Sequence, residues 1–302
     1  MEYKEYIPAY LKLSHEALKE RAAEAKKRLA SCYLCPWECR VNRLQGQLGR
    51  CRSTAMAAVS SYNAHFGEEP PLVGSYGSGT IFFTHCNLEC LFCQNWEISQ
   101  KGLGGEVEAC TLAEIMLDLQ RKKCHNINLV TPTPHVAAIL EALLLAVERG
   151  LKIPLVYNSS GYESLQTLKL LAGIIDIYMP DFKYADAEIA RRFSGPADYP
   201  ERAKEALREM YKQVGDLKTD RRGVAYRGLL VRHLVLPEGL AGTAEVVRFL
   251  AEEISPRCAV NIMSQYYPAY KARLYPPLDR PLNVAEYRRA KKIAADAGLR
   301  LI

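Results

Sequence analysis

The chain has 302 residues, a hydrophobic fraction of 49%, a charged fraction of 25% and a formal net charge of +6. This composition is ordinary for a soluble globular protein, and the length suits one large domain with a smaller module. No apolar run approaches the roughly 20 residues of a membrane helix, and Lys and Arg are dispersed rather than gathered in a stripe that would bind nucleic acid. We expect a cytoplasmic protein with neither a membrane nor a nucleic acid as partner, whose 10 cysteines serve as metal or redox ligands rather than as disulfides.

The first part of the chain predicts a helix followed by a cysteine-rich module. Apolar residues recur at three- and four-residue steps over residues 9–30, which is typical of an amphipathic helix. Four cysteines follow at C-x2-C-x3-C-x11-C spacing: Cys32, Cys35, Cys39 and Cys51. Four thiolates in so short a stretch suit either Zn²⁺ or an iron–sulfur cluster, and the spacing does not choose between them. The alternative is four independent buried thiols. We expect residues 1–75 to form this unit, with a metal that stabilises the fold of the module.

Residues 61–79 are rich in turn-forming residues and predict a connector. Their glycines are not followed by Lys-Ser or Lys-Thr, so they do not match a phosphate-binding loop of the Walker type.

Residues 76–302 alternate short apolar runs with amphipathic segments. The predicted strands are residues 80–84, 127–131, 153–157, 174–179, 229–236 and 259–263. The predicted helices are residues 112–123, 136–149, 163–172, 187–193 with 200–213, 242–253 and 284–297. This order indicates an α/β fold built from β/α units on a parallel sheet. Six units are too few for a closed eight-stranded barrel, so we predict a partial (β/α)6 TIM-like barrel.

A second set of cysteines directly follows the first predicted strand. Cys86, Cys90 and Cys93 stand at C-x3-C-x2-C spacing in one short loop. Thiolates hold iron–sulfur clusters, and a cubane with only three protein ligands keeps one iron open to another molecule. An electron-transfer scaffold and a zinc protein are the alternatives at this point.

Polar residues end or follow the next three predicted strands, and the strand over residues 229–236 carries another. They are Thr131, Asn158, Ser159, Asp181, Lys183 and Arg232. Because ligands bind at the carboxyl ends of parallel strands, these side chains could converge on a ligand with a carboxylate, an amine and a ribose. Each alone also fits ordinary turn or capping chemistry. We interpret His135 and His233 as hydrogen-bonded structural residues and assign no catalytic side chain.

The loop from Cys86 to Cys93, with Phe92 before its last cysteine, resembles the signature of the radical S-adenosylmethionine (SAM) superfamily. Within that superfamily the chain resembles the glycyl-radical activating enzymes, including pyruvate formate-lyase activating enzyme. It is most similar to a branch that combines an N-terminal cysteine-rich module with the run from Gly77 to Phe83.

The resemblance implies an iron–sulfur oxidoreductase with a radical SAM core domain. Cys86, Cys90 and Cys93 would hold a [4Fe–4S] cluster, and SAM would chelate the open iron. One electron, from an external donor such as flavodoxin or ferredoxin, would cleave SAM to methionine and a 5′-deoxyadenosyl radical that abstracts a hydrogen atom. The substrate would be a protein or peptide, including the backbone glycine of a glycyl-radical enzyme. The alternatives are a small-molecule substrate or a non-enzymatic electron-transfer role.

The resemblance also implies roles for the strand-end residues. Phe92 would lie near the adenine, and Thr131 falls where the family binds the SAM amino group, although Thr-Pro-Thr-Pro replaces a Gly-Gly-Glu pattern there. Asn158 and Ser159 match ribose or cation contacts. The remaining matches are the Asp-x-Lys element at Asp181 and Lys183, and a SAM-carboxylate contact at Arg232.

Overall fold

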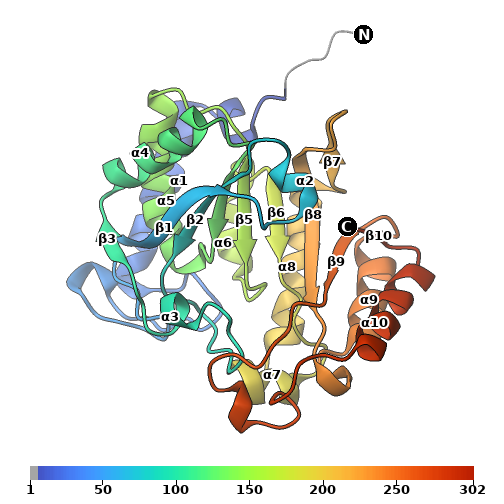
Figure 1. Cartoon of the computed structure of the whole chain (residues 1–302). Helices are drawn as coiled ribbons and strands as arrows, with labels where there is room; N and C mark the ends of the chain where they lie inside the picture. The colour runs from blue at the N-terminus through green and yellow to red at the C-terminus, as the bar shows by residue number, and fades with distance from the viewer. Residues whose placement is uncertain (1–5) are drawn as a thin grey trace.

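The computed structural model describes residues 6–302 and contains a 10-stranded sheet (Figure 1). Its parallel strands are β2 (Ser78–Phe83), β4 (Ile127–Val130), β5 (Leu155–Ser159), β6 (Ile177–Pro180), β8 (Ala225–Leu234), β9 (Ala259–Met263) and β10 (Arg300–Leu301). They lie side by side in chain order, and each neighbouring pair is parallel. Since the order never reverses, successive right-handed crossovers place their helices on one face of the sheet, as in a barrel. The strand order of the described residues runs from β10 to β3 without returning, so the sheet is open.

The crossover helices match the predicted ones to within a few residues at each end. They are α4 (Ala109–Arg121), α5 (Val136–Glu148), α6 (Leu165–Leu170), α7 (Ala187–Ser194), α8 (Tyr199–Val214), α9 (Thr243–Phe249) and α10 (Val284–Asp296). A π-helical turn, Leu250–Ile254, extends α9. Shorter 3₁₀ turns are Arg43–Gln45, Thr133–His135, Pro237–Gly239 and Ala272–Leu274.

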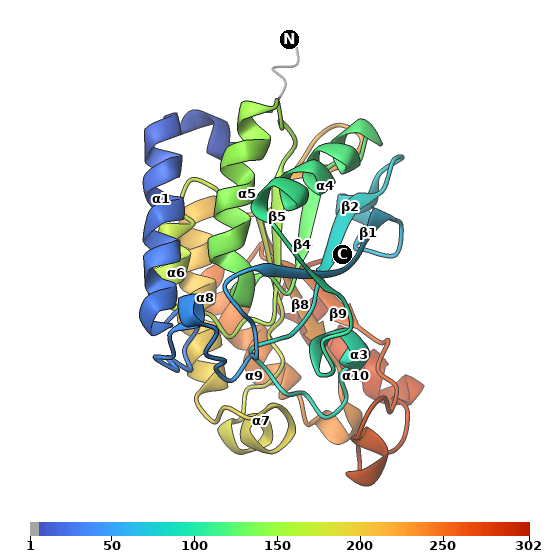
Figure 2. The ribbon, with the colours of Figure 1, turned by 90° about the vertical axis from the view of Figure 1, so that its left-hand side faces the viewer.

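The N-terminal helix covers α5. The sequence of α5 is apolar nearly all round, so it must be buried on both sides. The sheet covers one side, and α1 (His15–Lys27) lies along the other (Figure 2). The prediction of one continuous helix over residues 9–30 is wrong, because this stretch forms three separate segments. A 3₁₀ turn (Ala9–Lys12) ends before Ser14, whose hydroxyl accepts from the Ala17 N–H and starts α1, and a second turn (Arg28–Ser31) follows.

The predicted connector is wrong over its first part. Residues Ala57–His65 form β1, which pairs antiparallel with β2 on one side and with β3 (Gly105–Val107) on the other. Much of β1 is partly exposed and carries small or polar residues, so it lacks the apolar run that marks the other strands. Although β1 precedes residue 76, it belongs to the same sheet as the β/α units. Short helices α2 (Pro70–Val73) and α3 (Trp96–Ser99) and the hairpin strand β7 (Lys218–Thr219) complete the elements.

Two strand ends approach each other closely at Gly161. This residue follows β5 with φ +79°, and a Cβ placed on it would collide with the Asp181 carbonyl oxygen. The Asp181 N–H donates to the Ser159 carbonyl at 2.9 Å, so the same contact brings the ends of β5 and β6 together. Glycine is required here by both backbone conformation and space.

Replacing Gly161 with Ala should therefore destabilise the fold through overpacking as well as strain. The matched control is Gly150→Ala, because Gly150 has φ +89° but a Cβ added to it would have no neighbour within 4 Å. We expect Gly161→Ala to lower the free energy of unfolding by about 2 kcal/mol more than the control does. Urea unfolding of both variants measures the difference. Equal losses would show that the close approach is not a constraint.

Candidate active site

The three-cysteine loop lies at the carboxyl edge of the sheet, between β2 and α3. The thiols of Cys86, Cys90 and Cys93 line one pocket there. The end of α7 supports the loop, because the N–H groups of Glu89 and Leu91 donate to the carbonyls of Ser194 and Phe193. Figure 1 shows α3 and α7 at the same end of the sheet.

Each thiol has a polar neighbour. The Ser194 hydroxyl donates to Cys90 Sγ at 2.9 Å, and the Leu88 N–H donates to Cys86 Sγ at 3.4 Å. Cys93 Sγ lies 3.1 Å from the Ser99 hydroxyl. Burial raises the pKa of the Cys90 thiol to about 11, although Lys183 opposes this shift. Binding of iron would therefore displace a proton from the thiol, after which the donors would stabilise the thiolate.

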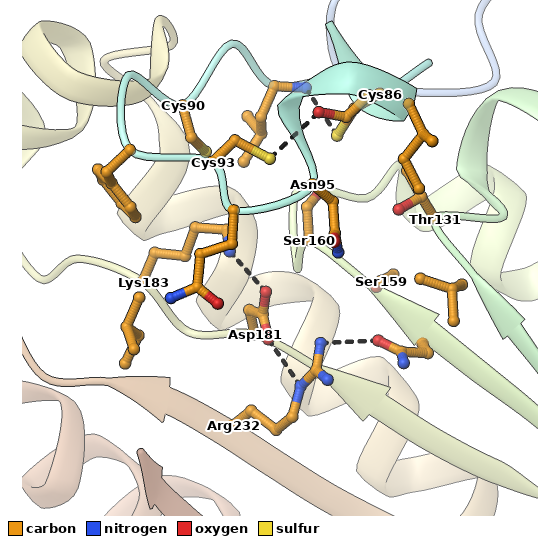
Figure 3. Close-up of a pocket in the computed structure, with 18 of the residues that line it drawn as sticks. Cys86, Cys90, Cys93, Asn95, Thr131, Ser159, Ser160, Asp181, Lys183 and Arg232 are labelled. Atoms are coloured by element: carbon orange, nitrogen blue, oxygen red, sulfur yellow. Dashed lines mark hydrogen bonds and ion pairs between the residues drawn. The ribbon is translucent and has the colours of Figure 1, made fainter. Parts of the chain in front are cut away.

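The same pocket contains all the residues that the family resemblance assigned to SAM binding. It is lined by Phe92, Thr131, Asn158, Ser159, Asp181, Lys183 and Arg232. Figure 3 shows the three cysteines on one side of the pocket and Asp181 and Arg232 on the opposite side. The residues come from four successive strand ends and from the cysteine loop, so the parallel order of the sheet is what gathers them.

An ion group forms the side of the pocket opposite the thiols. The Asp181 carboxylate accepts from Lys183 Nζ at 2.5 Å and from Arg232 Nε at 2.9 Å. Another nitrogen of Arg232 donates to Asn158 Oδ1 at 2.7 Å. Burial alone would raise the pKa of Asp181, but Arg232 and Lys183 outweigh it and hold the pKa below its usual value. The carboxylate is therefore ionised, and both cations are fixed beside the pocket.

Glu69 joins this group, and the sequence did not predict it. Its carboxylate is buried, lies 4.0 Å from Arg232 Nε and accepts from Asn261 Nδ2 at 3.2 Å. Glu69 comes from the segment interpreted as a connector, where no periodicity marks a buried position. Ser194 also carried no signal, because it lies 104 residues from the Cys90 thiol to which it donates.

Phe92 and Thr131 occupy constrained positions. Phe92 packs edge-on against Tyr184 and Tyr266, with ring centroids 6.3 and 5.9 Å away. Thr131 follows β4 with φ +61°, and its N–H donates to the Asn158 carbonyl at 2.9 Å. A β-branched residue in the left-handed region is strained, and such strain clusters at functional sites.

The two histidines are structural, as predicted. His135 is buried, stacks on Phe83 and lies 2.9 Å from the Thr84 carbonyl oxygen. His233 is buried between the Phe182 carbonyl and the Thr243 hydroxyl. Burial lowers the pKa of each to about 4, so both are neutral near pH 7. Neither lines the pocket.

The three thiols of the pocket fit a cubane cluster, in which each cysteine binds a different iron. Three protein ligands leave the fourth iron of such a cluster open to another molecule. The pocket beside them offers paired cations, amide and hydroxyl groups, and the apolar Phe92. These groups suit a zwitterionic ligand with a ribose and an aromatic base.

The open parallel sheet and the three-thiol pocket are compatible with a protein that holds a ligand beside an iron–sulfur cluster. Comparison with known proteins gives the family. A family model described as "Radical SAM superfamily" matches residues 80–221, and the chain belongs to this superfamily. It is a radical SAM enzyme, and the family implies a [4Fe–4S] cluster and SAM as cofactors.

Two relatives come from Methanocaldococcus jannaschii. The uncharacterized protein MJ0674 is 32% identical over 287 residues, which cover 92% of this chain and 78% of that protein. The uncharacterized protein MJ0808 is 24% identical, covering 90% of this chain and 79% of that protein. A similar fold occurs in Streptococcus suis SuiB, solved with its precursor peptide SuiA, at a TM-score of 0.51 and 14% identity. That match covers 72% of this chain but only 46% of SuiB.

None of the helices in residues 6–302 combines the length and apolarity needed to cross a membrane.

The Asp181 ion group should contribute to stability as well as to the site. Asp181→Asn removes the charge that faces both Lys183 and Arg232, which are mostly buried. We expect a loss of roughly 3 kcal/mol in the free energy of unfolding, the usual cost of removing one partner of a buried pair. Glu188→Gln, which breaks the exposed pair with Arg191, should leave the free energy of unfolding nearly unchanged. Urea unfolding distinguishes them, and similar losses would contradict the importance of the buried group.

Proposed function

We propose that the protein binds a [4Fe–4S] cluster through Cys86, Cys90 and Cys93, cleaves SAM reductively at it, and acts on a protein or peptide substrate. One observation carries the proposal: the three thiols and the polar strand-end residues line a single pocket. When bound, the reduced cluster supplies the electron that breaks a sulfonium C–S bond of SAM, giving methionine and a 5′-deoxyadenosyl radical that abstracts hydrogen. An external one-electron donor, such as flavodoxin or ferredoxin, reduces the cluster.

In this proposal the residues of the pocket bind and orient SAM. Arg232 attracts the SAM carboxylate, while Asp181 and Lys183 set the charge beside it. Asn158 and Ser159 hydrogen-bond the ribose, and Phe92 provides an apolar wall for the adenine. Thr131 presents its backbone at the position of the amino group. The ion group is already assembled among these side chains, so little reorganisation is needed on binding.

The macromolecular substrate is the finer part of the proposal. The chain resembles glycyl-radical activating enzymes, such as pyruvate formate-lyase activating enzyme, which act on a backbone glycine of a partner. SuiB, which has a similar fold, was solved with a precursor peptide bound, so a peptide is compatible with this architecture. We therefore include activation of a glycyl-radical enzyme within the proposal.

Reductive cleavage of SAM tests the first part. After anaerobic reconstitution, the wild-type protein with SAM and dithionite should release 5′-deoxyadenosine, and Cys90→Ala should release none above background. Cys110→Ala is the matched control, because Cys110 is exposed and lies outside the pocket. Liquid chromatography measures the product. Release by Cys90→Ala, or none from wild type with iron and sulfide present, would refute the assignment.

Isotope transfer tests the substrate. An extract of the source cells grown in deuterated medium is separated by size into macromolecules and small metabolites, and each fraction is added to the unlabelled enzyme with SAM. We expect deuterium in 5′-deoxyadenosine only with the macromolecular fraction, because the abstracted atom comes from the substrate. Mass spectrometry gives the enrichment. Enrichment from the small-molecule fraction alone would overturn the peptide substrate while leaving SAM cleavage intact.

A further inference from the structure

The four N-terminal cysteines meet in space. The side chains of Cys32, Cys35, Cys39 and Cys51 border one small pocket, together with Thr133 and Pro134 of the 3₁₀ turn that follows β4. Cys32 and Cys51 are buried, Cys35 and Cys39 are half-buried, and all four are free thiols. Independent thiols spread over 20 residues of irregular chain have no reason to face one space, whereas metal ligands do.

The backbone around these thiols is shaped to bring them together. Glu38 and Arg40 have φ values of +41° and +57°, so the chain turns sharply on both sides of Cys39. A Cβ on Gly49 would lie 3.0 Å from Cys39 Sγ, so any other residue would have to push the sulfur aside. The Arg50 N–H donates to that sulfur at 3.3 Å.

A buried cation borders the pocket. The Arg43 guanidinium is buried and lies 3.8 Å from Cys32 Sγ. Four thiolates with Zn²⁺, or with a [4Fe–4S]²⁺ core, carry a net charge of about −2 (four negative charges plus two positive). Arg43 supplies part of the opposite charge, which neutral thiols would not require.

We propose that Cys32, Cys35, Cys39 and Cys51 bind a second metal centre, zinc or an iron–sulfur cluster, and that this centre holds the three-cysteine loop in position. The thiols border the pocket without converging on a single ion position, so the metal would draw them inward by side-chain rotation.

Two contacts couple this module to the three-cysteine loop. Trp37, between Cys35 and Cys39, donates from Nε1 to the Asn87 carbonyl at 2.7 Å. Arg50, next to Cys51, forms an ion pair with Glu89 at 3.0 Å. Asn87 and Glu89 are themselves the neighbours of Cys86 and Cys90. Each contact therefore joins a residue close to a ligand of one site with a residue adjacent to a ligand of the other.

Further contacts fasten the module in place. The guanidinium of Arg50 lies 4.5 Å from the centre of the Trp37 ring. The Trp37 ring also packs edge-on against the Tyr162 ring, with their centroids 5.8 Å apart. Arg43 donates to the Pro134 carbonyl at 2.7 Å, just beyond β4, and Arg52 donates to the Gln100 carbonyl beside the pocket. A metal that orders the module would therefore also hold the three-cysteine loop and the neighbouring wall of the pocket in position.

Metal content tests the site independently of SAM chemistry. The variant in which Cys86, Cys90 and Cys93 are all Ser keeps only the N-terminal set. We expect it to retain either about one zinc or about four irons with sulfide, and both results support the centre. Adding Cys35→Ser should remove that metal, whereas adding Cys110→Ser should not. A folded triple variant, judged by circular dichroism, that binds neither metal after reconstitution would overturn the proposal.

Coupling between the sites is tested with Trp37→Phe, which keeps an aromatic ring but loses the N–H that reaches Asn87. We expect the metal content of the N-terminal site to be unchanged. The rate of SAM cleavage should fall roughly fivefold, as for the loss of one hydrogen bond. The electron paramagnetic resonance signal of the reduced cluster with SAM should also change. Tyr33→Phe is the matched control, because Tyr33 is in the same module and its ring contacts Arg28 and Arg40 rather than the loop. Wild-type rate and signal in Trp37→Phe would exclude the positioning role.

Discussion

The ion pair between Asp181 and Arg232 is the interaction on which the active-site edge of the sheet depends. Strand β6 ends in Pro180, which has no N–H to donate to its neighbour β8. Beyond the proline the two strands are joined by the Asp181–Arg232 pair and by the Phe182 N–H, which donates to the Arg232 carbonyl at 2.8 Å. The pair that joins the ends of β6 and β8 also places a guanidinium and, through Lys183, an ammonium beside the pocket.

The parts of the site that lie at strand ends or in one short loop could be predicted from sequence. The strand ends were recognisable because apolar runs and helices alternate, and in a parallel sheet every residue just past a run reaches the same edge. Asp181 and Arg232 were therefore predictable as neighbours although 51 residues separate them. The cysteine loop was predictable because its ligands are separated by only three and two residues.

Residues without a local pattern could not be predicted. Glu69 is buried beside Arg232 but lies in a segment of prolines and glycines with no periodicity. Ser194 reaches Cys90 from the end of α7, and sequence spacing carries no information about such a contact. Strand β1 pairs along β2 through its backbone while much of its side-chain surface stays accessible, so its residues need not be apolar.

Segments before and after the region that matches the family model also hold the three-cysteine loop in place. Residues 80–221 match the radical SAM family. Outside them, Trp37 binds the Asn87 carbonyl, the Lys271 N–H donates to the Leu91 carbonyl at 2.9 Å, and Gln94 donates to the Gln265 carbonyl at 2.6 Å. A loop this short has little stability of its own, so its ligand geometry depends on these distant supports. The segments before and after the shared core therefore support the loop that carries the three cysteines, and differences in these segments would alter how the thiols face the pocket.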